Sequence, residues 1–324
     1  MANAPQPEPV APVPAAPAAP PGLTTTQAPF IEEARAHGEI YIHQPYELYS
    51  DENQATWGRL LERMQPRWQR YANQRYLDGL HRLQLSPQRI PRLEEINHFM
   101  RPLTGFSARA VSGYVPSYHF FDCLSRREFP TTITIRDGRQ LEYLPEPDIF
   151  HDVGGHVPMH TDPAFAEALV KFGAVAAAAA RRASTARGPH GDPHERLRRL
   201  TSNVRAMSRF FWFSVEFGLM RSAGSPDALK VYGSGLLSSF GEIAHAIDAP
   251  EVQRYPFQIE WVVNQAFEIH HYQPLLFIVD SFDHLYALVT TLEQWMIEGK
   301  LDNVAPGEPA ISETDLESFL VTHP

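Results

Sequence analysis

The sequence predicts a mainly α-helical protein with one small β-hairpin element. Apolar residues recur at three- and four-residue spacings over several long stretches, the pattern of helices that bury one face. Alternation of β-branched and polar residues is confined to one segment, residues 131–143. The sequence has no glycine-rich loop of the kind that joins a strand to a helix in dinucleotide-binding or P-loop folds.

The composition narrows the possible functions. With 324 residues, 43% of them hydrophobic, the chain can bury a substantial core. Its 28 basic and 38 acidic residues give a formal net charge of −10, which argues against nucleic acid or an anionic membrane as the main partner. The single cysteine, Cys123, excludes an intrachain disulfide framework, a cysteine-rich zinc site and a self-contained iron–sulfur cluster. We therefore expect a cytoplasmic protein.

Residues 1–28 are predicted to form a disordered tail, and residues 29–324 a single globular domain. The tail consists mainly of alanine and proline and has too few large apolar side chains to form a core. No membrane span is expected, because the apolar stretch at residues 174–180 is too short and leads directly into Arg181 and Arg182.

Helices account for most of the predicted domain. Ser50 is a suitable N-cap for a helix whose apolar face carries Trp57, Leu60, Leu61, Met64 and Trp68. Similar periodicity predicts helices over Arg75–Leu83, Leu93–Met100, Asp162–Arg182, Glu195–Met220 and Phe282–Glu298, with a Gly/Pro loop at Arg187–Pro193.

The hairpin is predicted from three consecutive features. Residues 131–136 alternate, Asp137-Gly138 is a typical two-residue turn, and residues 139–143 alternate again. This pattern predicts two antiparallel strands joined by a type I′ turn.

Two histidines form the first half of a candidate metal site. His151 and His156 are five residues apart, which in a straight α-helix would place them about 140° apart around the axis. Two glycines between them and Pro158 beyond them predict that a helix ends here, so that His156 can turn back towards His151. The His156/His160 pair has the easier spacing for a helix, but Pro158 lies between the two residues. Because most histidines bind no metal, a third ligand is needed.

Glu216 is the candidate third ligand. It is the only charge in the apolar run Phe210–Met220, and a buried carboxylate is costly unless a cation or a metal compensates it. Arg209 and Arg221 flank the run and are the alternative partners. Two imidazoles and one carboxylate are the ligand set of oxygen-activating non-haem iron(II). Hydrolytic zinc also uses two histidines and one glutamate, but the His-Glu-x-x-His pattern of zinc peptidases is absent.

Together these segments resemble the pterin-dependent aromatic amino acid hydroxylases, and most of all the short bacterial phenylalanine hydroxylases. The resemblance rests on spaced blocks in the right order, over about residues 44–285. These blocks are Pro145–Pro158, Trp212–Leu219, Gly235–Glu242, Tyr272–Leu275 and Asp280–Phe282.

The resemblance implies a role for each matched residue. His151, His156 and Glu216 would hold Fe(2+). The substrate would be bound by Arg136, which Asp148 holds in place, and by a pocket that includes Trp212, Gly235 and Ser238. Without the resemblance, Arg136 and Asp148 would pass for ordinary surface charges. The tetrahydropterin, which is tetrahydrobiopterin or a related bacterial pterin, would contact Gly113, Val115, Phe120 and Asp152.

The expected function is therefore hydroxylation of L-phenylalanine to L-tyrosine with dioxygen by a catalytic domain at residues 29–324. Hydroxylation of tryptophan or tyrosine, meta-hydroxylation of phenylalanine and, more distantly, a zinc hydrolase stay open. Four positions depart from the family pattern: Leu144, Gly154, Phe211 and Phe267. We also expect a monomer, because no long coiled-coil segment follows the domain.

Overall fold

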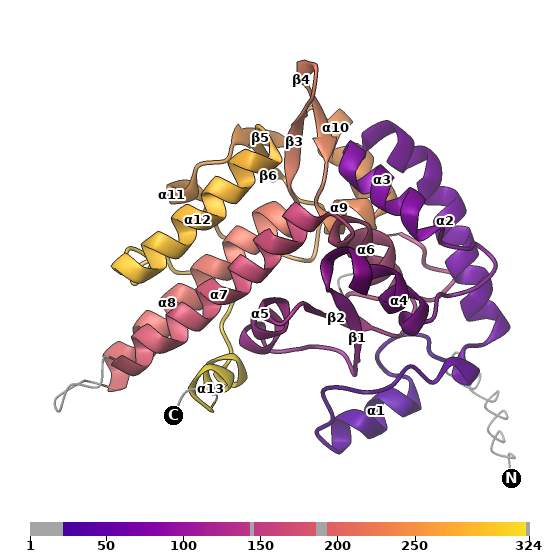
Figure 1. Cartoon of the computed structure of the whole chain (residues 1–324), viewed down its shortest axis with the longest axis horizontal. Helices are drawn as coiled ribbons and strands as arrows, with labels where there is room; N and C mark the ends of the chain where they lie inside the picture. Colours follow the sequence, from indigo (N-terminus) through magenta and orange to yellow (C-terminus); the bar gives the residue numbers. More distant parts are fainter. Residues whose placement is uncertain (1–21, 143–145, 186–192, 322–324) are drawn as a thin grey trace, which may run out of the picture.

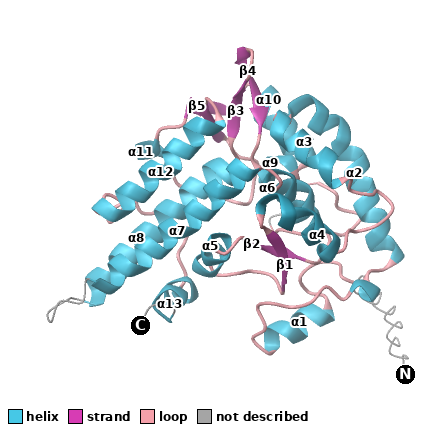
Figure 2. Ribbon diagram, viewed as in Figure 1, coloured by secondary structure: helices cyan, strands magenta, loops and turns pink. Residues whose placement is uncertain are grey.

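The computed structural model describes residues 22–142, 146–185 and 193–321, and helices dominate this part of the chain (Figures 1 and 2). The helices are α1 (Pro29–Ala36), α2 (Asp51–Tyr71), α3 (Gln74–Leu83), α4 (Leu93–Thr104), α5 (Ser117–Ser125), α6 (Val157–His160), α7 (Pro163–Thr185), α8 (Pro193–Phe211), α9 (Ser234–Leu237), α10 (Phe240–Asp248), α11 (Ile259–Val262), α12 (Phe282–Glu298) and α13 (Glu313–Val321). A 3₁₀ turn, η1 (Tyr46–Leu48), and two π-helical segments, η2 (Phe150–His156) and η3 (Trp212–Glu216), complete the helical elements.

The strands form two small sheets. In the first, β1 (Ser107–Val111) and β2 (Glu128–Thr132) pair in parallel. In the second, the order is β4-β3-β6-β5, with β3 antiparallel to β4 and β6 parallel to both β3 and β5. Its strands are β3 (Leu219–Ser222), β4 (Ser225–Val231), β5 (Gln253–Pro256) and β6 (Leu275–Val279).

The prediction of a mainly helical fold is confirmed, and most predicted helices lie where expected. The Ser50 hydroxyl accepts a hydrogen bond from the Asn53 amide at the start of α2, as an N-cap does. The five apolar residues predicted on one face of this helix are all at most 3% exposed. One C-terminal boundary is wrong: the helix predicted over Glu195–Met220 ends at Phe211, continues as the π-helical η3 and gives way to β3 at Leu219.

The predicted hairpin over residues 131–143 is wrong. Thr131 and Thr132 end β2, whose partner is the parallel strand β1, and no named strand includes residues 133–142. The side chains of residues 133–135 are all buried. Because both faces of this segment are covered, its alternation does not mark one solvated face of an antiparallel pair. An antiparallel hairpin does occur elsewhere, between β3 and β4.

The ordered part of the domain begins before the predicted boundary at residue 28. Leu23 is 1% exposed, its carbonyl accepts a hydrogen bond from the Ile135 amide, and Thr24 forms an isolated bridge with Ile135. The rest of the predicted tail, residues 1–21, lies outside the described residues, as do residues 187–192 of the predicted Gly/Pro loop. No helix in the described ranges is both long enough and apolar enough to cross a bilayer.

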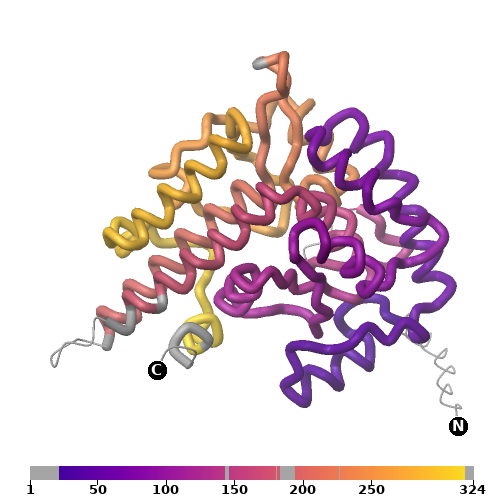
Figure 3. The backbone as a smooth tube through the Cα atoms, in the orientation of Figure 1, coloured from indigo at the N-terminus to yellow at the C-terminus, as the bar shows by residue number. Residues whose placement is uncertain are grey.

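The core holds η2 between two groups of helices. Helix α6, which directly continues η2, has α2 and α3 on one side and α7, α8 and α12 on the other (Figure 1; the same path is traced in Figure 3). From α2, Trp57 and Trp68 pack on Phe150 at ring-centroid distances of 5.4 and 6.2 Å. From α3, the Tyr76 hydroxyl donates to the Gly154 carbonyl at 2.7 Å. These contacts fix both the start and the middle of η2.

Candidate functional site

Three of the predicted site residues converge at the inner end of a pocket. The Nε2 atoms of His151 and His156 lie 3.2 Å apart. The Glu216 carboxylate lies 3.1 Å from Nε2 of His156 and 3.7 Å from Nε2 of His151. With ligand bonds of about 2.1 Å, neighbouring donors of an octahedral metal lie roughly 3.0 Å apart. The spacing of the three side chains therefore fits one shared metal ion.

A π-helical turn brings the two histidines together, which corrects the prediction that a helix ends between them. The Val157 amide donates to the Asp152 carbonyl, five residues back, so each turn holds one residue more than in an α-helix. Residues five apart then lie on nearly the same face. The alternative pair is farther apart: the ring centroids of His156 and His160 are 6.2 Å from each other, against 4.9 Å for His151 and His156, and His160 is not part of the cluster of possible ligands found among the described residues.

The second candidate segment, η3, has the same feature. The Phe217 amide donates to the Trp212 carbonyl at 2.8 Å, again across five residues. This turn carries Glu216 into the pocket near the two histidines. Neither flanking arginine is its partner: Arg209 is buried and donates to main-chain carbonyls, and Arg221 pairs with Asp280 at 2.9 Å.

The surroundings prepare the ligands for a cation. The Ser238 hydroxyl donates to the Gly235 carbonyl at 3.2 Å, so its oxygen accepts from Nδ1–H of His151 at 2.8 Å. This tautomer leaves the lone pair on Nε2 of His151, which faces the carboxylate. Burial lowers the pKa of His151 to about 4. Burial alone would raise the pKa of Glu216. The interactions of its carboxylate with His156, His151 and Ser234 have a larger effect and lower the pKa to about 2. A neutral imidazole beside an ionised carboxylate is the form that binds a metal.

Asp152 also lies close to the histidines. One of its oxygens is within 4.8 Å of ligand nitrogens of both His151 and His156. However, its Oδ2 accepts a hydrogen bond from the Thr132 amide at 2.6 Å, and burial raises the pKa of Asp152 to about 7. A carboxyl group that is half protonated near neutral pH is a weaker metal ligand than ionised Glu216.

Arg136 and Asp148 form a buried ion pair beside the two histidines and Glu216. Without the family resemblance, the sequence would have placed both charges on the surface. Their side chains are 4% and 2% exposed. Nε and Nη2 of Arg136 donate to the two oxygens of Asp148 at 2.8 and 2.9 Å. Asp148 also accepts from the His151 amide at 2.9 Å, which links the guanidinium directly to the metal-binding segment. Arg136 thus presents a fixed cation to the pocket.

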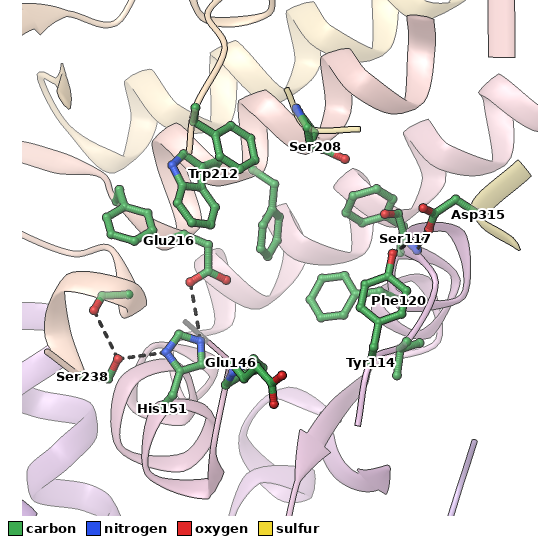
Figure 4. Close-up of a pocket in the computed structure, with 18 of the residues that line it drawn as sticks. Tyr114, Ser117, Phe120, Glu146, His151, Ser208, Trp212, Glu216, Ser238 and Asp315 are labelled. Atoms are coloured by element: carbon green, nitrogen blue, oxygen red, sulfur yellow. Dashed lines mark hydrogen bonds and ion pairs between the residues drawn. The ribbon is translucent and has the colours of Figure 1, made fainter. Parts of the chain in front are cut away.

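The pocket has a volume of about 430 Å³, and its lining includes the rings of Phe120, Phe121, Phe211, Trp212, Phe217 and Phe267 (Figure 4). Trp212 forms part of the wall, stacking on Phe267 at a centroid distance of 4.1 Å, and its Nε1–H donates to Gln273 at 3.1 Å. Gly235 also lines the pocket, and a Cβ there would lie 2.8 Å from the Phe217 ring. A pocket lined by aromatic rings and by one arginine suits an aromatic amino acid.

A second cavity of about 380 Å³ shares His151, Glu216 and Phe120 with the first. The predicted pterin contacts Gly113, Val115, Phe120 and Asp152 all line it. Gly113 has a φ of 128°, which side chains other than glycine rarely adopt. The ring of Phe120 lies 5.3 Å from that of Phe211, one of the departures from the family pattern. Leu144, another departure, lies outside the described residues.

The sequence analysis gave no role to some residues that line the pocket or support its wall. Gln273 is 3% exposed and receives the Trp212 indole N–H, and its own amide donates to the buried carboxylate of Glu242 at 2.8 Å. The C-terminal residues 309–311 and Asp315 also line the pocket. The sequence Ser312-Glu-Thr-Asp315 signals the start of a helix, but no sequence pattern indicates where that helix docks.

Comparison with known proteins gives a consistent result. Residues 37–185 and 197–298 match the family described as biopterin-dependent aromatic amino acid hydroxylase. A phenylalanine-4-hydroxylase from Mesorhizobium japonicum is 36% identical over 247 residues, which cover 76% of this chain and 82% of that protein. One from Caulobacter vibrioides is 37% identical over 244 residues, or 75% of this chain and 76% of that protein.

The solved structures agree. Phenylalanine hydroxylase from Chromobacterium violaceum, with bound iron(III) and 7,8-dihydrobiopterin, has a TM-score of 0.70 and 29% sequence identity, over 85% of this chain and 91% of that chain. The same enzyme with bound oxidised Fe(III) gives a TM-score of 0.71 at 29% identity, over 85% of this chain and 92% of that chain. The family match extends over well over half of the chain. The chain therefore belongs to the biopterin-dependent aromatic amino acid hydroxylases.

Proposed function

We propose that this chain is an iron(II)- and tetrahydropterin-dependent monooxygenase that converts L-phenylalanine to L-tyrosine with dioxygen. The observation that carries the proposal is the convergence of His151, His156 and Glu216 where two cavities meet, one of which is also lined by Arg136. The relatives named phenylalanine-4-hydroxylase support the choice of substrate. A cytoplasmic location and a monomeric state stay predictions.

In this proposal His151, His156 and Glu216 would hold the iron, and a set of three protein ligands would leave room for dioxygen. Ser238 keeps His151 in the tautomer whose Nε2 is free to bind. The bound iron activates dioxygen and the tetrahydropterin supplies two electrons, so that one oxygen atom enters the ring and the other is reduced to the level of water.

Arg136 binds the carboxylate of the amino acid. Because Asp148 engages the guanidinium at two nitrogens, the side chain is held in one orientation before the substrate arrives. The aromatic ring then lies along Trp212, with its far edge towards the metal ligands. Fixed distances between Arg136 and the two histidines thereby select which ring carbon is hydroxylated.

The second cavity takes the pterin. Phe120 offers an aromatic face for stacking, and the main chain at Gly113 and Val115 offers hydrogen-bonding groups to the edge of the ring system. Asp152, at the inner end, provides a carboxyl group near the histidines. The Chromobacterium violaceum structure with 7,8-dihydrobiopterin supports a pterin as the ligand of this cavity.

One incubation tests the proposal against its alternatives. Iron-loaded protein is mixed with tetrahydrobiopterin and oxygen, with phenylalanine, tyrosine and tryptophan in separate reactions, and products are separated by chromatography and identified by mass. We expect para-tyrosine from phenylalanine as the main product. meta-Tyrosine, or faster turnover of tryptophan or tyrosine, would replace the proposed reaction with another of the same family. Zinc in the purified protein, with no pterin-dependent oxygen uptake after iron loading, would refute the oxygenase itself.

A further inference from the structure

The segment at residues 305–315 lies outside the residues that match the family, yet it forms part of the active-site wall. The family match ends at residue 298, whereas Pro309, Ala310, Ile311 and Asp315 line the aromatic pocket. In Figure 1, α13 lies beside α5 and below the long helix α8. We call residues 305–315 the C-terminal strap.

The strap is fixed at its start by Arg209 of α8. This arginine is fully buried, and burial lowers its pKa to about 10, where it still carries its charge at neutral pH. Its guanidinium donates to the carbonyls of Ala305, Pro306 and Glu308 at 2.8, 3.1 and 2.9 Å. A buried cation shared among three carbonyls of one short segment holds that segment against α8.

The strap is fixed at its other end by Asp315, which is 2% exposed. Its Oδ2 accepts from the amide and the hydroxyl of Ser312 at 3.2 and 2.7 Å, an arrangement that caps its own helix α13. Its Oδ1 accepts from the Ser117 amide at 2.8 Å and from the Tyr114 hydroxyl at 2.9 Å. One oxygen therefore serves α13, and the other joins α13 to the start of α5.

The contacts with Ser312, Ser117 and Tyr114 engage both oxygens of the carboxylate, so we assign Asp315 a role in holding these neighbours. Burial would raise its pKa, but the donors from Ser117, Ser312 and Tyr114 outweigh burial and hold the pKa below its usual value. Asp315 therefore affects the pocket through the residues whose positions it fixes, Tyr114 and Ser117. Tyr114, Val115 and Phe120, from the turn before α5 and the first turn of α5, line both cavities, and Gly113 lines the second.

We propose that Asp315 is a positioning residue for the pterin site: through Tyr114 and Ser117 it fixes the turn and the helix start that carry Gly113, Val115 and Phe120. Figure 4 shows Asp315, Ser117 and Tyr114 grouped at the end of the pocket opposite His151 and Glu216. The inference rests on the proposed function, because it takes Phe120 and its neighbours as the pterin contacts. It adds to that function a residue outside the part of the chain that matches the family.

The test compares three single variants of the full chain. Asp315→Asn replaces an acceptor oxygen with an amide while keeping the shape. Ser312→Ala removes the helix cap but leaves the contacts of Oδ1, and Glu317→Gln removes an exposed charge from the same helix. Two pterin readouts are used: the KM for tetrahydrobiopterin, and the calorimetric Kd of the iron-loaded protein for 7,8-dihydrobiopterin, which needs no turnover. The KM for phenylalanine and the iron content are measured alongside.

We expect Asp315→Asn to raise both pterin constants about five- to tenfold, since one or two hydrogen bonds to a charged acceptor are lost. The KM for phenylalanine should rise less than the two pterin constants, because Tyr114, Val115 and Phe120 line both cavities. The iron content should change less than about twofold, as should all values for Ser312→Ala and Glu317→Gln. Unchanged pterin constants in Asp315→Asn would overturn the inference. So would an equal rise in Ser312→Ala, because Asp315 would then act only by capping its own helix.

Two further measurements keep the result interpretable. If Asp315→Asn fails to fold, Tyr114→Phe can be used instead, because it removes only the Tyr114 hydroxyl that donates to Asp315. This variant should raise the Kd for the pterin about two- to threefold, and an unchanged Kd would count against the inference. In the double variant, the two effects should not add, because both remove the same contact. Wild-type protein that binds dihydrobiopterin but forms no hydroxylated product would sink the proposed reaction and leave the role of Asp315 standing.

Discussion

Arg136→Ala tests whether the buried ion pair binds the substrate. Two hydrogen bonds between a guanidinium and a carboxylate contribute about 2–4 kcal/mol, so the KM for phenylalanine should rise roughly 30- to 1000-fold. The iron content should stay close to one per chain, because the contact from Asp148 to the His151 amide does not involve the guanidinium.

The same substitution also affects folding, and its magnitude follows from burial. Asp148 is 2% exposed, and without Arg136 it keeps two main-chain donors but no countercharge. Removing one partner of a buried ion pair costs about 3–5 kcal/mol of the free energy of unfolding. This is a large part of the stability of a typical domain, so urea unfolding must be measured together with the kinetics.

Arg136→Lys separates these two effects. Lysine keeps a positive charge beside Asp148, but a single ammonium group cannot bind two carboxylates with the geometry of a guanidinium. We expect most of the stability to return while the KM for phenylalanine stays at least about tenfold raised. A folded, iron-loaded Arg136→Ala protein with a KM within threefold of the wild-type value would refute the assignment, as would loss of iron with a normal KM.

Three further predictions concern the metal-binding segments. Glu216→Ala and His156→Ala should each abolish stoichiometric iron binding, measured by metal analysis after loading, and a fully loaded variant would count against the ligand set. Ser238→Ala should weaken iron binding about 10- to 100-fold, seen by chelator competition, because it frees the His151 ring; unchanged affinity would contradict this role. Gly154→Ala should stabilise the protein by about 0.4–1 kcal/mol in urea unfolding, since the nearest atoms to a Cβ there belong to the Phe150 ring, at an ordinary contact distance of 3.5 Å. Gly155→Ala should destabilise it by about 1–3 kcal/mol, because a Cβ there lies 2.8 Å from the Ser234 carbonyl oxygen; equal effects of the two substitutions would refute this distinction.

The sequence predicts those elements whose signals are local. The helix Phe282–Glu298 lies within the predicted bounds because Ser281 caps its start and Gly299 ends it in a left-handed conformation. The apolar face of α2 was predicted because apolar residues three and four positions apart lie on the same side of any straight helix. The residues of the candidate site were named because their blocks match a family, and the structure brings the metal candidates within 3.7 Å.

Elements that depend on distant partners were not predicted. Residues 131–135 have the composition of a strand, but they are covered on both sides, and the partner of β2 is β1, about twenty residues earlier. The pairing of Arg136 with Asp148 was expected only from the family resemblance. The sequence around Arg136 does not show which carboxylate contacts its guanidinium. The docking of the C-terminal strap against Arg209 likewise depends on a residue about one hundred positions away.

The two π-helical turns explain why spacing alone misdirected the reasoning about the histidines. An α-helix would place residues five apart about 140° from each other, so the sequence analysis required a helix end between His151 and His156. In the structure the helix continues with a wider turn. The backbone that carries the two histidines is therefore held by the main-chain hydrogen bonds of a helix and does not form a loop. Glu216 ends a second widened turn that begins at Trp212. Because all three candidate ligands lie on such turns, their spacing is built into rigid backbone, which allows the donors to stand about 3 Å apart without relying on the flexibility of side chains.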